Sequence, residues 1–184
     1  MTTKLIATTT WPVTLAEAKL RLRIDGTDDD ADLQMMIEAA TDLAANMTRR
    51  SIAVCSWQVR LDAFPSEIRL LHPPILTVQS VKYIDPDGAL QTLDPAAYSI
   101  DKDSEPGWLR PADGTTWPET KATANAVTID YTAGWGTSCP SAVKQFILLQ
   151  VGHMYRNREA ASDRPLMVAP YGERLLDRWK LWEV

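Results

Sequence analysis

Hydrophobic residues near the start of the chain repeat with the period of a helix. Residues 14–17 have the form of a capping box, in which Thr14 and Glu17 each accept the other's backbone N–H, so a short helix is expected to about Leu22. A longer amphipathic helix is predicted from about Asp28 to Arg49, because apolar residues recur there at i, i+3, i+4 and i+7. These residues are Leu33, Met36, Ile37, Ala40, Ala44 and Met47.

The middle of the chain changes to a period of two. Apolar and polar residues alternate over residues 55–61 and again over residues 127–132, which predicts half-buried strands. Alternation slips phase between Val78 and Val81, which predicts a bulge near Gln79 and Ser80. The turn residues of 85–88 are expected to connect a strand that ends near Ile84 to one at residues 90–93. A shorter strand is expected at residues 68–70, and brief strands near residues 98–100 and 108–110 within the long loops of residues 94–125.

A second helical region is predicted after the strands. Pro140 suits the first turn of a helix, and residues 142–155 are apolar on most sides, which is typical of a helix buried all round. A final helix is expected from about Gly172, with three apolar residues on one face: Leu175, Trp179 and Trp182. The predicted class is α+β, as a helical bundle of the N-terminal helix pair, the long third helix and the C-terminal helix, with an inserted antiparallel β region.

These elements suggest one compact domain of 184 residues with an insertion. We expect residues 1–50 to hold the N-terminal helices and residues 51–137 the β-rich insertion. Residues 138–161 are expected to form the buried bundle helix, and residues 162–184 a linker followed by a C-terminal docking helix.

Composition and charge restrict the classes of partner. The net charge is −5, and the longest run of basic residues is Arg49-Arg50, which argues against a protein that holds nucleic acid by its phosphates. The two cysteines lack metal-type spacing and suit a reducing cytosol. We expect no signal peptide and no membrane span, because no charged start precedes an apolar block and no 18-residue apolar stretch occurs.

No set of residues predicts an active site. The aspartates near residue 30 lack the bidentate glutamate of a calcium loop, since Met36 stands at that position, so helix capping is the expected role. His72 and His153 are isolated and expected to be structural. A helix start beside Cys139 favours a lowered thiol pKa, but no base is near it in sequence. We therefore expect no enzyme, no cofactor and no bound metal.

Two other functional classes remain as alternatives. A small metal-dependent or hydrolytic enzyme would need titratable groups that converge in a pocket, and only the aspartates form a compact cluster. A DNA-binding accessory factor would need a basic stripe, which the acidic balance argues against.

The last residues of the chain are unusually rich in tryptophan and leucine. Trp179, Leu181, Trp182 and Val184 crowd the final six positions, although chain ends normally fray unless something holds them. One interpretation is that they pack on the protein's own core. The other is that they dock into a partner as energetic anchors, with a polar rim formed by three basic residues. These are Arg174, Arg178 and Lys180.

Several segments, taken in order, resemble the head–tail connector family of tailed phages. The segments that carry the resemblance are residues 12–19, 22–25, 70–75, 78–85, 127–136, 153–159, 170–172 and 175–176. Each is weak alone, but their order and spacing are specific and extend over nearly the whole chain. One departure is Cys139-Pro140, where the family usually has an aliphatic residue before the proline.

The resemblance implies a non-catalytic structural subunit at the head–tail junction of a virion, made in the host cytoplasm. It implies a homo-oligomeric ring, commonly of twelve copies, between the portal protein and a downstream stopper or tail protein. The C-terminal segment is then expected to dock on the portal through Arg174, Leu175, Arg178, Trp179, Leu181, Trp182 and Val184.

A ring of this kind would surround the DNA exit channel. Twelve copies at −5 each sum to about −60, so a duplex would pass the wall without specific binding. The candidate channel-facing acidic residues are Asp28, Asp29, Asp30 and Asp32.

Overall fold

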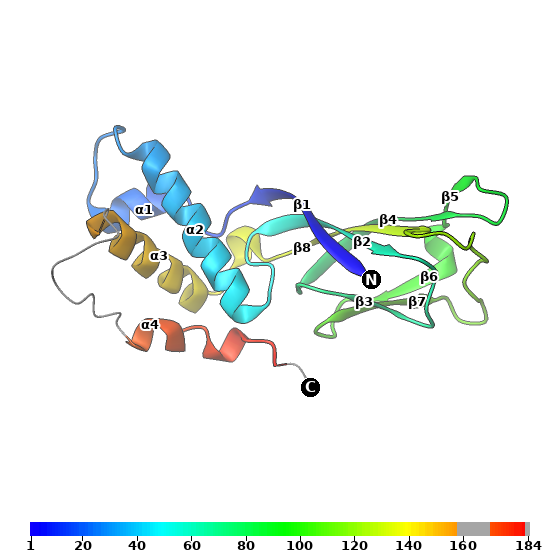
Figure 1. Ribbon diagram of the computed structural model, residues 1–184. Helices are drawn as coiled ribbons and strands as arrows, with labels where there is room; N and C mark the ends of the chain where they lie inside the picture. The colour runs from blue at the N-terminus through cyan, green and yellow to red at the C-terminus, as the bar shows by residue number, and fades with distance from the viewer. Residues whose placement is uncertain (158–169, 183–184) are drawn as a thin grey trace. The chain divides into compact units, whose positions relative to one another are not determined.

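The computed structural model describes residues 1–157 and 170–182, and the chain divides into two compact units (Figure 1). The sheet unit comprises residues 1–9 and 54–134, and the helix unit comprises residues 10–53 and 135–184. The chain therefore enters the sheet unit, leaves it for two helices, returns to it, and ends in the helix unit.

A five-stranded sheet forms most of the sheet unit. Its strands, in order across the sheet, are β1 (Thr2–Thr10), β2 (Val54–Leu61), β8 (Val127–Ala133), β4 (Ile75–Ile84) and β5 (Leu90–Thr92). The central strand β8 pairs antiparallel with both β2 and β4. Its residues Val127, Ile129, Tyr131 and Ala133 are all buried, because the side chains of alternate residues point to the same face.

A smaller antiparallel sheet belongs to the same unit. It consists of β3 (Ile68–Leu70), β7 (Gly107–Pro111) and β6 (Tyr98–Asp101), in that order. Leu70 and Leu109 of this sheet pack in one apolar cluster with Val59 and Ile129 of the larger sheet. The two sheets thus share a core.

Two local features of the β region confirm the sequence prediction. The pairing of β4 with β8 shifts register between Val78 and Ser80, at the expected bulge. The turn after β4 is closed by the backbone N–H of Gly88, which donates to the Asp85 carbonyl at 2.9 Å. Gly88 has φ of 93°, a conformation that glycine adopts without steric cost.

The helix unit is built around three helices, α1 (Leu15–Leu22), α2 (Asp30–Thr48) and α3 (Ser141–Arg156). Helices α2 and α3 pack along each other, and α1 contacts both. Fully buried Leu33 and Ile37 of α2 meet Phe146 and Ile147 of α3 in the apolar core of this unit. The apolar face that the sequence predicted for α2 is therefore the face that packs inward.

The expected helical bundle with an inserted β region is wrong. The described residues form eight strands in two sheets and four α-helices, so the fold is a sheet-rich α+β fold. The brief strands expected near residues 98–100 and 108–110 are confirmed, because β6 and β7 of the small sheet lie there. The sequence prediction missed β1, a threonine-rich strand whose residues are mostly exposed and which carries little alternation.

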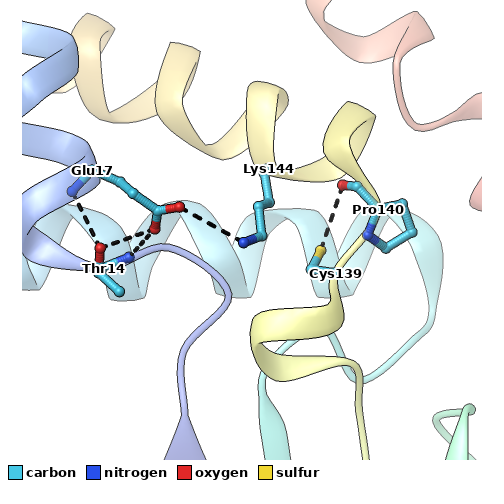
Figure 2. Close-up of polar contacts among 5 residues, drawn as sticks. All are labelled: Thr14, Glu17, Cys139, Pro140 and Lys144. Carbon is cyan, nitrogen blue, oxygen red and sulfur yellow. Dashed lines mark hydrogen bonds and ion pairs between the residues drawn. The ribbon is translucent and has the colours of Figure 1, made fainter.

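The predicted capping box at the start of α1 is confirmed (Figure 2). The Thr14 hydroxyl accepts the Glu17 backbone N–H at 3.2 Å, and the Glu17 carboxylate accepts the Thr14 backbone N–H at 2.7 Å. Lys144 of α3 lies 3.7 Å from the same carboxylate. The capping box therefore begins α1, and its Glu17 also links α1 to α3 through Lys144.

Removing this cap is expected to weaken the helix unit. Thr14→Ala should lower the free energy of unfolding by about 1 kcal/mol, because one backbone N–H at the helix start loses its acceptor. The backbone N–H of Thr14 is the main cause that lowers the pKa of Glu17. The stability that the Glu17 carboxylate contributes is therefore fully present above the ordinary glutamate pKa. It is lost as the pH falls through the lowered pKa of Glu17.

Urea unfolding of the Glu17→Gln variant across acidic pH would measure that dependence. We expect the free energy of unfolding of this variant to fall less than that of the wild type as the pH is lowered. Glu173→Gln, which changes an exposed carboxylate, should retain it. An identical acid profile for Glu17→Gln and the wild type would contradict the assignment.

Candidate functional site

The C-terminal segment, residues 170–182, is not the continuous helix that the sequence predicted. Helix α4 (Pro170–Arg174) is short, and a 3-10 turn (Asp177–Trp179) follows it. The backbone beyond Trp179 is extended and bonds to α2 instead of to itself, because the Leu181 N–H donates to the Thr48 carbonyl at 3.1 Å. Tertiary hydrogen bonds thus replace those of a helix.

Part of this segment is anchored in the core of the helix unit. Leu176 is fully buried, and Leu175 and Trp179 pack against the same apolar cluster. The Trp179 ring meets Trp135 edge to face, with ring centroids 5.4 Å apart. Trp179 therefore packs on the protein's own core, which is the first of the two interpretations of this segment.

Arg50, just after the end of α2, binds the C-terminal segment. Its side chain is buried, and its Nε donates to the Trp179 carbonyl at 2.6 Å. The Arg50 guanidinium also lies 5.4 Å from the centroid of the Trp135 ring, within the range of a cation–π interaction. One arginine therefore binds both aromatic residues of this contact.

Other residues of the segment face solvent. The Trp182 side chain is 77% exposed, and Arg174 and Arg178 are exposed as well. Lys180 forms an ion pair with Asp177 at 2.7 Å. The structure thus divides the predicted docking residues into an anchored group (Leu175, Trp179 and the half-buried Leu181) and an exposed group (Arg174, Arg178 and Trp182). Val184 lies outside the described residues.

Asp28 and Asp29 precede α2, whereas Asp30 and Asp32 lie in its first turn, and their surroundings differ. Asp28 is exposed, whereas Asp29 accepts the Tyr155 hydroxyl at 2.6 Å and Asp30 forms an ion pair with Lys19 at 2.7 Å. Asp29 stands at the N-cap of α2, but its side chain makes no capping bond. The capping role expected for Asp29 is therefore wrong, since its carboxylate bonds to α3 instead.

The contacts of Cys139 and His72 are those of residues that stabilise the fold. Burial raises the pKa of the Cys139 thiol to about 12, so the lowered pKa expected from the helix start is wrong. Figure 2 shows the thiol directed at the Pro140 carbonyl, 3.8 Å away. His72 stacks on Trp57 with ring centroids 4.0 Å apart, and burial lowers its pKa.

Two other kinds of feature are missing from the described residues. Across residues 1–157 and 170–182, no group of three or more histidine, cysteine, aspartate and glutamate side chains is arranged to hold a metal ion. In the same part of the chain, no helix is both long enough and apolar enough to cross a membrane.

Sequence reasoning missed Arg50 and Thr48 as the residues that hold the C-terminal segment. It treated Arg50 only as a cation that closes α2, because favourable helix-end charge explains an arginine at that position without any tertiary contact. Contacts between residues more than 120 positions apart leave no local pattern. Only the unusual clustering of tryptophan and arginine in the sequence indicated that a packing site was needed.

Comparison with known proteins gives one family and several structures. Residues 12–83 match the model of the family described as "Phage gp6-like head-tail connector protein". No curated protein matches the chain at significant similarity.

Three similar solved structures come from particles of a gene transfer agent (GTA). "Neck of empty GTA particle computed with C6 symmetry" is similar at a TM-score of 0.81 and 23% identity. "Neck of native GTA particle computed with C12 symmetry" is similar at 0.77 and 22%, and "Virion of native gene transfer agent (GTA) particle" at 0.77 and 24%. Each match covers 100% of this chain and 97% of the other.

The structural likeness shows that the two-unit fold is shared along the whole chain, and the family match covers α1, α2 and strands β2 to β4. The resemblance to the head–tail connector family of tailed phages is therefore confirmed.

Proposed function

We propose that this protein is a non-enzymatic subunit of a ring in the neck of a tailed-phage or phage-like particle, at the head–tail junction. One observation carries the proposal: the fold matches chains of particle necks over 100% of this chain and 97% of theirs. Those necks were computed with C6 and C12 symmetry, which supports a cyclic homo-oligomer. The family match over residues 12–83 gives independent support.

The finer proposal is that the ring joins the portal protein to a stopper or tail protein. In it, the exposed group of the C-terminal segment contacts the portal, and Trp182 inserts as the anchor between Arg174 and Arg178. The exposure of Trp182, at 77%, supports this role, since large aromatic and arginine side chains dominate the binding energy of protein interfaces. Leu175, Trp179 and Leu181 hold the segment in position, and Val184 extends the proposed contact beyond the described residues.

DNA passes through the proposed ring without specific binding. The net charge of −5 per chain supports this, because an acidic wall repels the phosphates of a duplex. Of the acidic residues near the start of α2, Asp28 is exposed and makes no ion pair within the described residues, so it is the best candidate to face the channel. Asp29 and Asp30 are already bonded within the helix unit.

Replacing the exposed tryptophan tests the portal contact. Trp182→Ala should weaken binding of the full-length protein to the purified portal of the same particle by about 2 kcal/mol, roughly 30-fold in Kd. Binding can be followed by cosedimentation. Leu90→Ala, which changes an exposed leucine of β5, is the control and should bind as the wild type does.

Unchanged binding of Trp182→Ala would reject the portal contact and leave the neck location intact. The location has its own test, which is mass spectrometry of necks purified from intact particles. Absence of this chain from those necks would reject the proposed function.

A further inference from the structure

Helix α2 carries apolar residues on the face that points away from its own core. Met35 is 61% exposed and Leu43 is 43% exposed, and Ala31 and Ala39 are exposed beside them. At about 100° per residue, these positions fall on one continuous face of the helix. We call them, with Glu38 and Asp42, the α2 outer face.

This face is also acidic. Glu38 and Asp42 are one helical turn apart, and like charges at this spacing destabilise a helix by a few tenths of a kcal/mol. Gln34 donates to Glu38 at 2.9 Å, but no cation forms an ion pair with Glu38 or Asp42 among the described residues. Partial burial and the Glu38 charge raise the pKa of Asp42, as expected of a carboxylate that lacks a counter-charge.

Helix α1 presents a face of the opposite charge. Leu20 is 81% exposed, the most exposed of the large apolar side chains in the described residues. Arg21 and Arg23 beside it are exposed and form no ion pair within the described part of the chain. The other two charges of the helix are already engaged, Glu17 with Lys144 and Lys19 with Asp30. We call Leu20, Arg21 and Arg23 the α1 outer face.

The two outer faces complement each other but cannot meet within one copy, because each points away from the core of the same helix unit. A cyclic ring needs this arrangement, since its contacts are heterologous and each subunit must present two different faces. We propose that the α1 outer face of one copy docks on the α2 outer face of the next copy in the ring. Leu20 packs against Met35 and Leu43, and Arg21 and Arg23 face Glu38 and Asp42.

This inference rests on the proposed function, because it supplies the contact that closes the ring. A second copy of the chain is the expected occupant, because the two faces carry opposite charges, two arginines against two carboxylates, beside exposed apolar side chains.

Charge exchange between the two faces tests the contact. The variants Arg21→Glu/Arg23→Glu and Glu38→Lys/Asp42→Lys should each lower incorporation of the full-length chain into particle necks by at least about tenfold. All four substitutions in one chain should restore most of it, since each contact then pairs carboxylates with lysines again. Arg156→Glu, an exposed cation at the end of α3, is the matched control and should incorporate normally.

A cross-link gives a second readout that needs no charge change. In necks containing Leu20→Cys/Met35→Cys, mild oxidation should join copies into a ladder of covalent multimers. Neither single variant should do so, and the native Cys55 and Cys139 are buried. Circular dichroism and thermal unfolding check that all variants are folded.

The proposal is overturned if the variant with all four charge substitutions enters necks no better than either double variant. It is also overturned if the chain with both cysteines enters necks and stays monomeric on oxidation. Absence of the wild-type chain from necks is a different result and would reject the proposed function itself.

Discussion

Replacing Leu176 by alanine is expected to lower the free energy of unfolding by about 2–5 kcal/mol. Leu176 is fully buried in the apolar cluster of the helix unit, although it lies only eight residues before the end of the chain. Its replacement leaves a cavity that the three surrounding helices can fill only in part. Urea unfolding of the full-length protein would measure the loss.

Trp182→Ala is the matched control on the same segment. Its side chain is mostly exposed, so we expect its unfolding free energy to stay within about 0.5 kcal/mol of the wild-type value. Equal stability of Leu176→Ala and the wild type would mean that the segment does not pack on the helix unit. A truncation after Glu173 would not test docking, because it removes the buried Leu176 as well.

Phe146→Ala is expected to be more destabilising, by about 3–5 kcal/mol. Phe146 is fully buried in α3 and packs in the cluster that contains Leu33 and Ile37 of α2, so the loss falls on the main helix pair. Thermal unfolding monitored by circular dichroism would report it as a lower Tm.

Phe146→Leu keeps much of the apolar volume and should cost less than the alanine variant. A graded loss, alanine greater than leucine, supports close packing at this position. A cost below about 1 kcal/mol for Phe146→Ala would show that the site is poorly packed and contradict the structure.

Sequence periodicity identified the elements that have one buried and one exposed face. It predicted β2 and β8, the inward face of α2, the bulge in β4 and the capping box of α1, all of which the structure contains. It also predicted short strands where β3, β6 and β7 of the small sheet lie, but it failed for β1. Strand β1 lies at a sheet edge and is mostly exposed, so burial imposes no alternation on its side chains.

The C-terminal segment shows a different limit of the same method. The spacing of Leu175, Trp179 and Trp182 suits one face of a helix, but α4 ends at Arg174. Farther along, the segment forms hydrogen bonds to Arg50 and Thr48 instead of to itself. The same limit applies to Leu20, Met35 and Leu43, whose side chains do not belong to the buried faces of their helices. Periodicity cannot show whether such residues are unimportant or form a second surface, and only their exposure in the fold distinguishes the two.

Anchoring of the C-terminal segment also affects how tightly a partner can bind Trp182. A flexible chain end loses conformational freedom when it binds, at roughly 1–2 kcal/mol for each residue backbone that becomes fixed. Here Leu176, Trp179 and Leu181 are already held by contacts within the folded subunit, so most of that entropy loss occurs during folding. The preorganised segment therefore leaves more of the interaction energy of Trp182 available as affinity.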